Sequence, residues 1–208
     1  MSAILLLGGV RSGKSRLAER LAGAFDRVAY VAPGPVPDPV TDPEWAARVA
    51  EHRNRRPASW STVETGDVPA AIRNAEAPCV LVDCLGTWVT RIVDDAGAWD
   101  DRELAERALS RATAELASAL RDTTATVVLV SNEVGWGVVP GHPSGRLFRD
   151  GLGRLNQTMA GVCDRVLLVV AGRVVDLSDA ATVGGLDTRT VVTSRTSAGD
   201  GDPEVREP

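Results

Sequence analysis

The feature that most constrains this chain is a glycine-rich stretch that directly follows a short apolar run. Residues 8–15 read Gly-Gly-Val-Arg-Ser-Gly-Lys-Ser, the pattern G-x-x-x-x-G-K-[ST], and residues 3–7 read Ala-Ile-Leu-Leu-Leu. The glycines allow several backbone N–H groups to turn toward one anion, Lys14 adds a charge for the β- and γ-phosphates, and the Ser15 hydroxyl is placed to ligate Mg²⁺. Residues 16–22 have helical spacing, so the positive end of a helix dipole would face the phosphates. The sequence therefore predicts a strand, a phosphate-binding loop and a helix; a chance glycine-rich turn is the simpler alternative, which this context disfavours.

Strand-like and helix-like segments alternate along most of the chain. We expect strands at 28–32, 60–64, 79–83, 126–130, 165–170 and 173–177, and helices at 44–53, 67–74, 85–93, 102–120 and 146–162. The longest helix should present one apolar stripe made of Leu104, Ala108, Leu109, Ala112, Leu116 and Leu120. Such alternation is typical of an α/β fold with a mainly parallel central sheet flanked by helices. Ala171 and Gly172 predict a tight hairpin that adds a C-terminal antiparallel edge. With the phosphate-binding loop, the pattern predicts a P-loop NTPase fold.

Composition and charge limit the class of protein. We expect one domain at 1–178 and a flexible C-terminal tail at 179–208, which has few large apolar residues. The net charge of −5 argues against a nucleic-acid binder, because it provides no global basic field. Three widely spaced cysteines, Cys79, Cys84 and Cys163, indicate reduced thiols rather than a disulfide frame or a zinc site. With no signal peptide and no apolar run of about 20 residues, we expect a cytoplasmic protein without a membrane span.

Polar residues follow two of the predicted strands. Asp83 ends the apolar run 79–83, and P-loop proteins commonly carry an acidic residue for Mg²⁺ at the end of a neighbouring strand. The alternative is that Asp83 caps the helix after it. Asn132 and Glu133 follow the run 126–130, and such a loop points into the ligand crevice of a parallel sheet. They would contact substrate or position a water, unless Glu133 only starts a tight turn.

A histidine stands beside a cluster of arginines. His52 precedes Arg53, Arg55 and Arg56, and guanidinium groups match phosphate oxygens in two-point contacts. A basic run is usually a solvated face, but this one occurs in an acidic chain that already has a phosphate loop. His52 would be a nucleophile toward phosphorus, a general base, or only a cation at a helix C-terminus. The second histidine, His142, lies in a Pro/Gly segment and is predicted to be a surface residue.

In their order along the chain, these residues resemble the bifunctional adenosylcobinamide kinase / adenosylcobinamide-phosphate guanylyltransferase family of cobalamin biosynthesis. The resemblance spans about residues 3–177. It is carried by the segments 6–15 and 46–49, by the spacing of His52, Arg56-Pro57, Trp60 and Glu64, and by the segments 81–90, 130–140 and 148–157. Each segment alone is modest support, whereas the ordered set is specific.

The resemblance implies an enzyme with two activities. One phosphorylates the aminopropanol hydroxyl of adenosylcobinamide with ATP or GTP, and the other transfers GMP from GTP to that phosphate, giving adenosylcobinamide-GDP and pyrophosphate. It implies that Lys14 and His52 are catalytic, that His52 is guanylylated, that Ser15 and Asp83 hold Mg²⁺, and that the chain forms a homo-oligomer. The implied nucleotide contacts are Gly8, Gly9, Val10, Arg11, Ser12, Gly13, Lys14, Ser15, Ala32, Pro33, Gly34, Arg53, Asn54, Arg55, Arg56, Glu64 and Asp83.

Two other functions stay open at this point. The chain could be a P-loop kinase of another small metabolite, with a structural His52, or a nucleotide-dependent switch or assembly protein. If both activities are present, the segment with His52 must move between them, because one reaction occurs at the γ-phosphorus and the other at the α-phosphorus. For a large, flat corrinoid, Trp88 and Trp136 are candidate contacts, although tryptophans are more often core anchors.

Overall fold

The computed structural model describes residues 2–36 and 38–185, which contain all the helices and strands given below. The chain divides into two units, Met1–Ser178 and Asp179–Pro208. The described helices and strands belong to the first unit. The expected flexible tail at 179–208 lies mostly outside the described residues, which reach residue 185.

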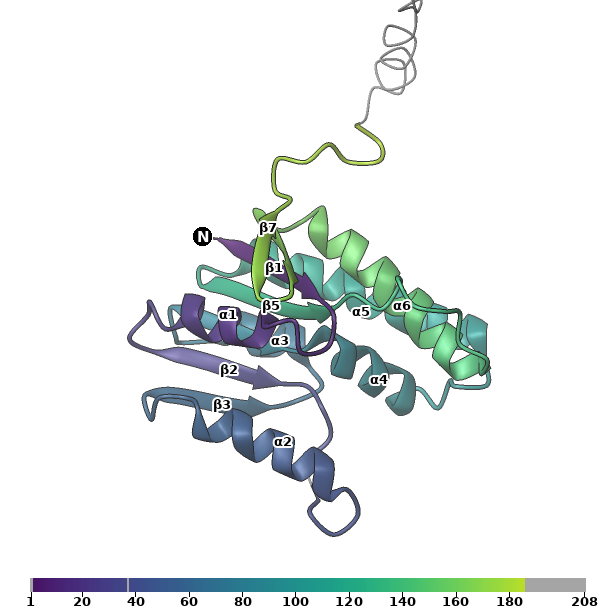
Figure 1. Ribbon diagram of the computed structural model, residues 1–208, viewed down its shortest axis with the longest axis horizontal. Helices are drawn as coiled ribbons and strands as arrows, with labels where there is room; N and C mark the ends of the chain where they lie inside the picture. The colour runs from purple at the N-terminus through teal and green to yellow at the C-terminus, as the bar shows by residue number, and fades with distance from the viewer. Residues whose placement is uncertain (1, 37, 186–208) are drawn as a thin grey trace, which may run out of the picture. The chain divides into compact units, whose positions relative to one another are not determined.

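Seven strands form one sheet in the order β3-β2-β4-β5-β1-β6-β7 (Figure 1). Their bounds are β1 (Ala3–Gly8), β2 (Val28–Ala32), β3 (Trp60–Glu64), β4 (Cys79–Asp83), β5 (Thr126–Asn132), β6 (Arg165–Val170) and β7 (Arg173–Asp176). All neighbouring strands are parallel except β6 and β7, which form an antiparallel hairpin. Its turn residues Ala171 and Gly172 both have positive φ, 50° and 74°, as a tight hairpin turn requires. The predicted α/β class with an antiparallel edge is confirmed.

The described residues form six helices that pack around this sheet. They are α1 (Lys14–Ala22), α2 (Pro43–Asn54), α3 (Val68–Arg73), α4 (Leu85–Asp95), α5 (Arg102–Asp122) and α6 (Pro143–Ala160). Successive strand residues point to opposite faces: Leu6 and Leu81 pack with α1, whereas Leu5 and Val80 pack into the larger core with α3 to α6. Figure 1 shows α2 next to β3, at the edge of the sheet opposite β7.

The start of α2 follows from its sequence. The side chain of Asp42 accepts a hydrogen bond from the backbone N–H of Trp45 at 2.9 Å, and Pro43 occupies the first turn. A carboxylate cap followed by proline is a strong helix start, because proline lacks the N–H that a first turn leaves unpaired. The helix that starts at this cap carries His52 in its last turn.

Several predicted boundaries are wrong by a few residues. Helix α6 begins at Pro143, three residues before the expected start, with His142 as its N-cap residue. Proline is compatible with a first turn, so the Pro/Gly segment does not exclude a helix there. The predicted apolar stripe of α5 is confirmed at Leu109, Leu116 and Leu120, which are buried, but not at Leu104, which is 36% exposed; Ala105, Ala117 and Ala119 are buried as well. The larger core thus accepts small side chains from α5 beside its three buried leucines.

The carboxyl ends of β1 to β5 lie along one edge of the sheet. In sheet order this edge presents Glu64, Ala32, Asp83, Asn132 and Gly8, the last residues of β3, β2, β4, β5 and β1. Ligands of open parallel sheets bind outside this edge. The predicted site residues therefore gather where a ligand of this fold class binds. No helix in the described part of the chain is long and apolar enough to cross a membrane.

Candidate functional site

The phosphate loop connects β1 to α1 and is held tightly against its surroundings. Arg11 and Gly13 have positive φ, 57° and 104°, and the N–H of Ser12 donates to the carbonyl of Gly9 at 3.2 Å. A Cβ added to Gly8 would lie 2.5 Å from the Val169 carbonyl oxygen and 2.6 Å from Ser12 Oγ. The loop therefore needs glycine at positions 8 and 13, for close approach and for backbone conformation respectively.

Two backbone hydrogen bonds tie this loop to other strands. The N–H of Glu133 donates to the Gly8 carbonyl at 3.0 Å, and the N–H of Gly172 donates to the Ser12 carbonyl at 2.9 Å. One bond comes from the end of β5 and the other from the β6–β7 turn. The loop is thus fixed from both neighbouring strands of β1, which favours a site that is formed before ligand binds.

Lys14 is the first residue of α1 and lies against the loop. Lys14 is only 9% exposed, and its Nζ atom donates a hydrogen bond to the Gly9 carbonyl at 3.2 Å. A buried ammonium group is costly unless it is compensated by polar partners or an anion. The position of this charge, inside the loop and at the positive end of a helix, suits a bound phosphate.

Asp83 ends β4, and its carboxylate is partly unsatisfied. Its Oδ2 atom is buried and has no hydrogen-bond partner among the described residues, and the same holds for Ser12 Oγ in the phosphate loop. Buried polar atoms are normally paired. The helix-cap alternative for Asp83 is wrong, because Cys84 is the N-cap residue of α4 and pairs with Thr87. These two unpartnered atoms therefore fit a site that a nucleotide or a metal ion completes.

The strand of Asp83 is not the neighbour of β1, contrary to the expectation of an adjacent acidic strand. In the sheet β5 lies between β1 and β4, which separates their backbones by about 10 Å at a strand spacing of about 4.8 Å. However, α1 packs on β4 and β5 as well as on β1. The helix that carries Ser15 therefore leans from its own strand toward the strand of Asp83.

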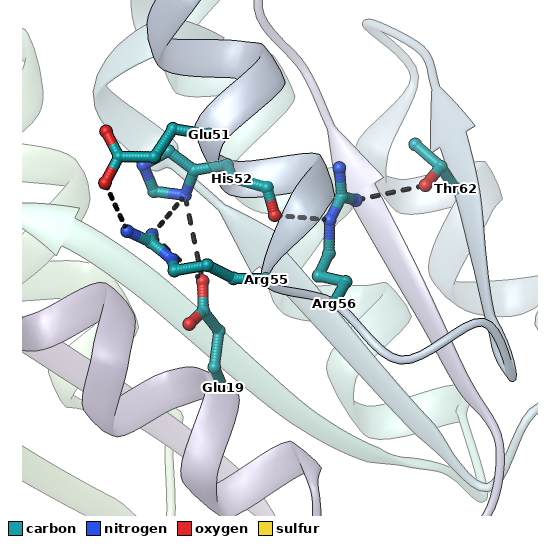
Figure 2. A network of polar contacts seen from close by, with 6 residues as sticks. All are labelled: Glu19, Glu51, His52, Arg55, Arg56 and Thr62. Carbon is teal, nitrogen blue, oxygen red and sulfur yellow. Dashed lines mark hydrogen bonds and ion pairs between the residues drawn. The ribbon is translucent and has the colours of Figure 1, made fainter.

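His52 lies in a polar cluster between α2 and α1 (Figure 2). Its Nδ1 atom is 3.1 Å from Arg55 Nη2 and 3.8 Å from Glu19 Oε1. Arg55 also pairs with Glu19 at 3.2 Å and with Glu51 at 3.0 Å. Because Glu19 is on α1, the cluster brings the predicted nucleophile to the helix that follows the phosphate loop.

The other arginines of the basic run are engaged with β2 and β3. Arg53 pairs with Glu64, so two predicted nucleotide contacts meet each other. Arg56 donates to the His52 carbonyl and to Thr62 Oγ1, both at 3.0 Å, and its guanidinium lies 3.8 Å from the ring centre of Tyr30. Burial lowers the pKa of Arg56, and burial followed by the charge of Asp83 raises the pKa of Tyr30. Arg56 thus helps to attach the end of α2 to the sheet.

The loop after β2 links α2 to α4. A Cβ added to Gly34 would lie 3.0 Å from the ring of Trp45 and 3.5 Å from Thr87. Trp45 also donates its indole N–H to the carbonyl of Pro35 at 3.1 Å. Gly34 therefore lies between these two helices, and it follows Ala32, which ends β2 at the same sheet edge as Asp83.

The loop after β5 has both structural and exposed parts. Glu133 Oε1 accepts from the N–H of Gly135 at 2.8 Å, so the predicted alternative of a turn is present. Beyond it Trp136 is 74% exposed. Trp88, in contrast, is 1% exposed and donates to the Gly66 carbonyl at 2.8 Å. Trp88 is therefore a core residue, and the expectation that it offers a surface to a corrinoid is wrong.

Sequence reasoning missed Glu19 and Tyr30. Glu19 stands four residues after Ser15, on the same face of α1, which is the one available signal. Nothing in the sequence indicates that this face meets α2. Tyr30 looked like an ordinary strand residue, and its role as the platform for Arg56 depends on a contact across 26 residues of chain.

Comparisons with known proteins agree with this geometry. Residues 4–177 match the family described as cobinamide kinase / cobinamide phosphate guanyltransferase. The chain is 40% identical over 178 residues to the bifunctional adenosylcobalamin biosynthesis proteins CobU of Escherichia coli and of Salmonella typhimurium, covering 81% of this chain and 96% of each relative. It is 42% identical over 174 residues to CobP of Pseudomonas aeruginosa, a protein of the same description, covering 81% of this chain and 92% of the relative.

A distant likeness to a solved structure extends over most of the chain. The P4 protein from bacteriophage phi6 in complex with ADP has a TM-score of 0.42 and 16% identity, covering 83% of this chain and 52% of that one. So distant a likeness says nothing about function. The family match and the close relatives span nearly the whole first unit, including the phosphate loop and His52. The chain therefore belongs to the cobinamide kinase / cobinamide phosphate guanyltransferase family.

Proposed function

We propose that the chain phosphorylates adenosylcobinamide with ATP or GTP and then transfers GMP from GTP, through His52, to adenosylcobinamide phosphate. The products of the second reaction are adenosylcobinamide-GDP and pyrophosphate. The observation that carries the proposal is the contact of His52 with Glu19 on α1, the helix that begins in the phosphate loop. The contact supports the proposal because it sets His52 beside the helix that follows the phosphate loop, and a simple kinase needs no histidine there.

In the kinase reaction the protein positions and neutralises the phosphates. The γ-phosphoryl group passes from the nucleotide to the aminopropanol hydroxyl, and the transition state carries spread negative charge. Lys14 and the backbone N–H groups at the start of α1 stabilise that charge. The backbone hydrogen bonds that the carbonyls of Gly8 and Ser12 accept from neighbouring strands keep these donors in place.

In the guanylyl transfer a histidine nitrogen forms a bond to the α-phosphorus while the bond from that phosphorus to the bridging oxygen of the β-phosphate breaks. Pyrophosphate leaves with the electron pair of the broken bond. A phosphate oxygen of the cobinamide then attacks the same phosphorus, and the histidine nitrogen recovers its lone pair. Arginines from the run 53–56 would neutralise the leaving pyrophosphate. In the structure Arg53 pairs with Glu64 and Arg56 donates to Thr62. The arginines can therefore reach the pyrophosphate only if the end of α2 rearranges.

Mg²⁺ would be held by the Ser15 hydroxyl and the Asp83 carboxylate, and it would supply charge neutralisation at the phosphates. The buried, unpartnered Oδ2 of Asp83 fits that function. Among the described residues no three His, Cys, Asp or Glu side chains cluster to hold a metal ion. A Mg²⁺ ion that binds together with phosphates and waters needs only a few ligands from the protein.

The expectations of a homo-oligomer, of a cytoplasmic location and of no nucleic-acid partner are part of this proposal. The cysteines of the described residues are free thiols, which suits a reducing compartment. The net charge of −5 gives no general attraction for nucleic acid. Light scattering on the purified chain would measure the oligomeric state.

The proposal is tested by incubating the enzyme with GTP labelled at the α-phosphate. We expect a covalent protein adduct that is labile in acid and stable in base, that is absent from the His52→Ala variant, and that is retained by the control His142→Ala. Lys14→Ala should impair both reactions, whereas His52→Ala should keep most kinase activity. An adduct that persists in His52→Ala would refute the role of His52, as would equal loss of both activities.

The same assay separates the alternatives. A kinase of another metabolite would release ADP without any covalent label. A nucleotide-dependent switch would hydrolyse GTP slowly and without dependence on adenosylcobinamide. The proposed enzyme turns nucleotide over repeatedly only with the corrinoid, and with GTP alone it stops after one equivalent has formed the adduct.

A further inference from the structure

The contacts of His52 Nδ1 define the protonation state of its ring. Arg55 Nη2 lies 3.1 Å from Nδ1, in hydrogen-bond geometry (Figure 2). A guanidinium group has only donors and stays protonated in proteins. Nδ1 must therefore be the acceptor, so it carries no proton, and the ring proton of the neutral imidazole is on Nε2.

This form of the imidazole cannot attack phosphorus. Its one in-plane lone pair is on Nδ1, where Arg55 covers it, and Nε2 has no free lone pair because it bears the proton. Yet the carboxylate of Glu19 is 3.8 Å from the same Nδ1 atom. An ionised Glu19 carboxylate can only accept hydrogen bonds, so it can pair with Nδ1 only when that nitrogen bears the proton.

We propose that Arg55 and Glu19 are positioning residues that set the tautomer of His52. Without nucleotide, Arg55 holds the ring in the unreactive form protonated at Nε2. When Arg55 turns to the triphosphate, Nε2 gives its proton to water and Nδ1 takes one from water, Glu19 accepts the hydrogen bond of Nδ1, and Nε2 becomes the nucleophile. This inference rests on the proposed guanylylation of His52.

The reaction balances in the second state. The Nε2 lone pair forms the bond to the α-phosphorus, and the phosphorus–oxygen bond to pyrophosphate breaks with its electrons leaving on oxygen. The ring keeps its Nδ1 proton and becomes positively charged, next to the Glu19 carboxylate. When the cobinamide phosphate displaces the ring, neutral imidazole protonated at Nδ1 returns, so neither step needs a proton transfer. A preorganised negative charge beside a developing positive charge stabilises the transition state.

The charges around the cluster allow Arg55 to change partners. Its side chain is 38% exposed and pairs with Glu19 on α1 and with Glu51 on its own helix. The Glu51 side chain is 69% exposed and Glu19 only 16%, so the Glu51 pair is a weak, solvent-screened contact. A triphosphate offers more negative charge and a two-point match for the guanidinium, whereas Glu19 stays in place beside His52.

The first test reads the tautomer directly by long-range ¹H–¹⁵N NMR of the full chain, at a pH where His52 is neutral. The chain has two histidines, so the His142→Asn variant assigns the signals. We expect the Nε2-protonated form without nucleotide and the Nδ1-protonated form with the α,β-methylene analogue of GTP, which cannot transfer GMP. The Arg55→Met variant, which lacks the donor, should show the Nδ1-protonated form without any nucleotide. A ring protonated at Nδ1 in the nucleotide-free wild type, or no change in either experiment, would overturn the inference.

The second test measures the rate of adduct formation from α-labelled GTP. Glu19→Gln keeps the shape but removes the charge, and we expect labelling to be about 10- to 100-fold slower, because hydrogen bonds to charged groups are the stronger class. The matched control is Glu51→Gln, which removes a partner of Arg55 that does not touch His52; its labelling rate should stay within about twofold. Thermal melts confirm that both variants are folded.

The outcomes separate this inference from the proposed function. Labelling of Glu19→Gln at the wild-type rate would refute the role of Glu19 while leaving His52 as the nucleophile. Labelling of His52→Ala would refute the proposed function itself.

Discussion

At the scale of single residues, Gly8 shows how closely the phosphate loop approaches β6. We predict that Gly8→Ala destabilises the protein by about 1–3 kcal/mol, as overpacked sites do, because the new methyl group would meet a backbone carbonyl and Ser12 Oγ. In a domain of this size, that lowers Tm by several degrees. The matched control is Gly9→Ala, where an added Cβ meets nothing within 4 Å. Equal Tm values for the two variants, measured without nucleotide, would contradict the prediction.

The residues of the site differ in how visible they are in the sequence. The loop at 8–15 is predictable, because its glycines and lysine are contiguous and their spacing has one physical purpose. The role of Glu19 is not predictable, because the sequence does not indicate which residue a carboxylate on a helix surface will contact. The pairing of Arg53 with Glu64 is likewise invisible, since both residues are equally suited to solvent or to a ligand. Local chemistry was therefore predictable, and contacts between separate elements were not.

At the scale of elements, Asn156 joins α6 to the end of β5. Ser131 Oγ donates to Asn156 Oδ1 at 2.5 Å, and Asn156 Nδ2 donates to the Asn132 carbonyl at 3.1 Å. We predict that Asn156→Leu costs about 1–3 kcal/mol, because it leaves the fully buried hydroxyl of Ser131 without this partner. The neighbouring and exposed Gln157 provides the control variant Gln157→Leu, whose urea midpoint should change little. A wild-type midpoint for Asn156→Leu would show that the bridge contributes no stability.

The loop after β5 is an element with an exposed apolar tip. Arg149 Nη1 donates to the Val138 carbonyl at 3.0 Å, and Arg146 holds the carbonyls of Pro140 and Gly141, so α6 fixes the base of the loop. Trp136 is left largely exposed, and flat aromatic faces suit flat ligands. We predict that Trp136→Ser raises KM for adenosylcobinamide by about tenfold or more, the loss typical when an aromatic anchor covered by its ligand is truncated. Guanylylation of His52 from GTP alone serves as the internal control, and its rate should not change. An unchanged KM would show that Trp136 does not contribute to corrinoid binding.

The elements themselves were largely predictable, but their neighbours were not. Asp42 and Pro43 predict the start of α2, because a cap residue and a first-turn proline are local signals. The position of β5 between β1 and β4 has no such signal, because strand order depends on which helices pack together across the sheet. As a result, Asp83 was expected on the strand beside the phosphate loop and lies one strand further away. The buried face of α5 is likewise set by its packing against α3, α4 and α6, which leaves Leu104 exposed and buries Ala105 beside the predicted leucines.

At the scale of the whole molecule, stability should fall in alkaline solution because buried thiols resist ionisation. Burial raises the pKa of Cys79 from 9.0 to about 11, and burial followed by Asp164 raises that of Cys163 to about 12. A group whose pKa is higher in the folded than in the unfolded state binds more protons when folded. Its contribution is complete below the unfolded pKa and is lost as the pH rises toward the folded one. For Cys79 this loss is about 2 kcal/mol between pH 9 and pH 11.

The measurement is urea unfolding of the reduced protein from pH 7 to pH 11. Cys79→Val replaces the thiol by a side chain that does not titrate, so the fall in the free energy of unfolding between pH 9 and pH 11 should become shallower. The adjacent core residue Val80 supplies the control, because Val80→Ala leaves a cavity and lowers stability equally at every pH. Only the slope distinguishes the two variants, so the comparison does not depend on how well valine packs at position 79. If Cys79→Val keeps the wild-type slope, buried ionisation at β4 is not what limits the alkaline stability of the fold.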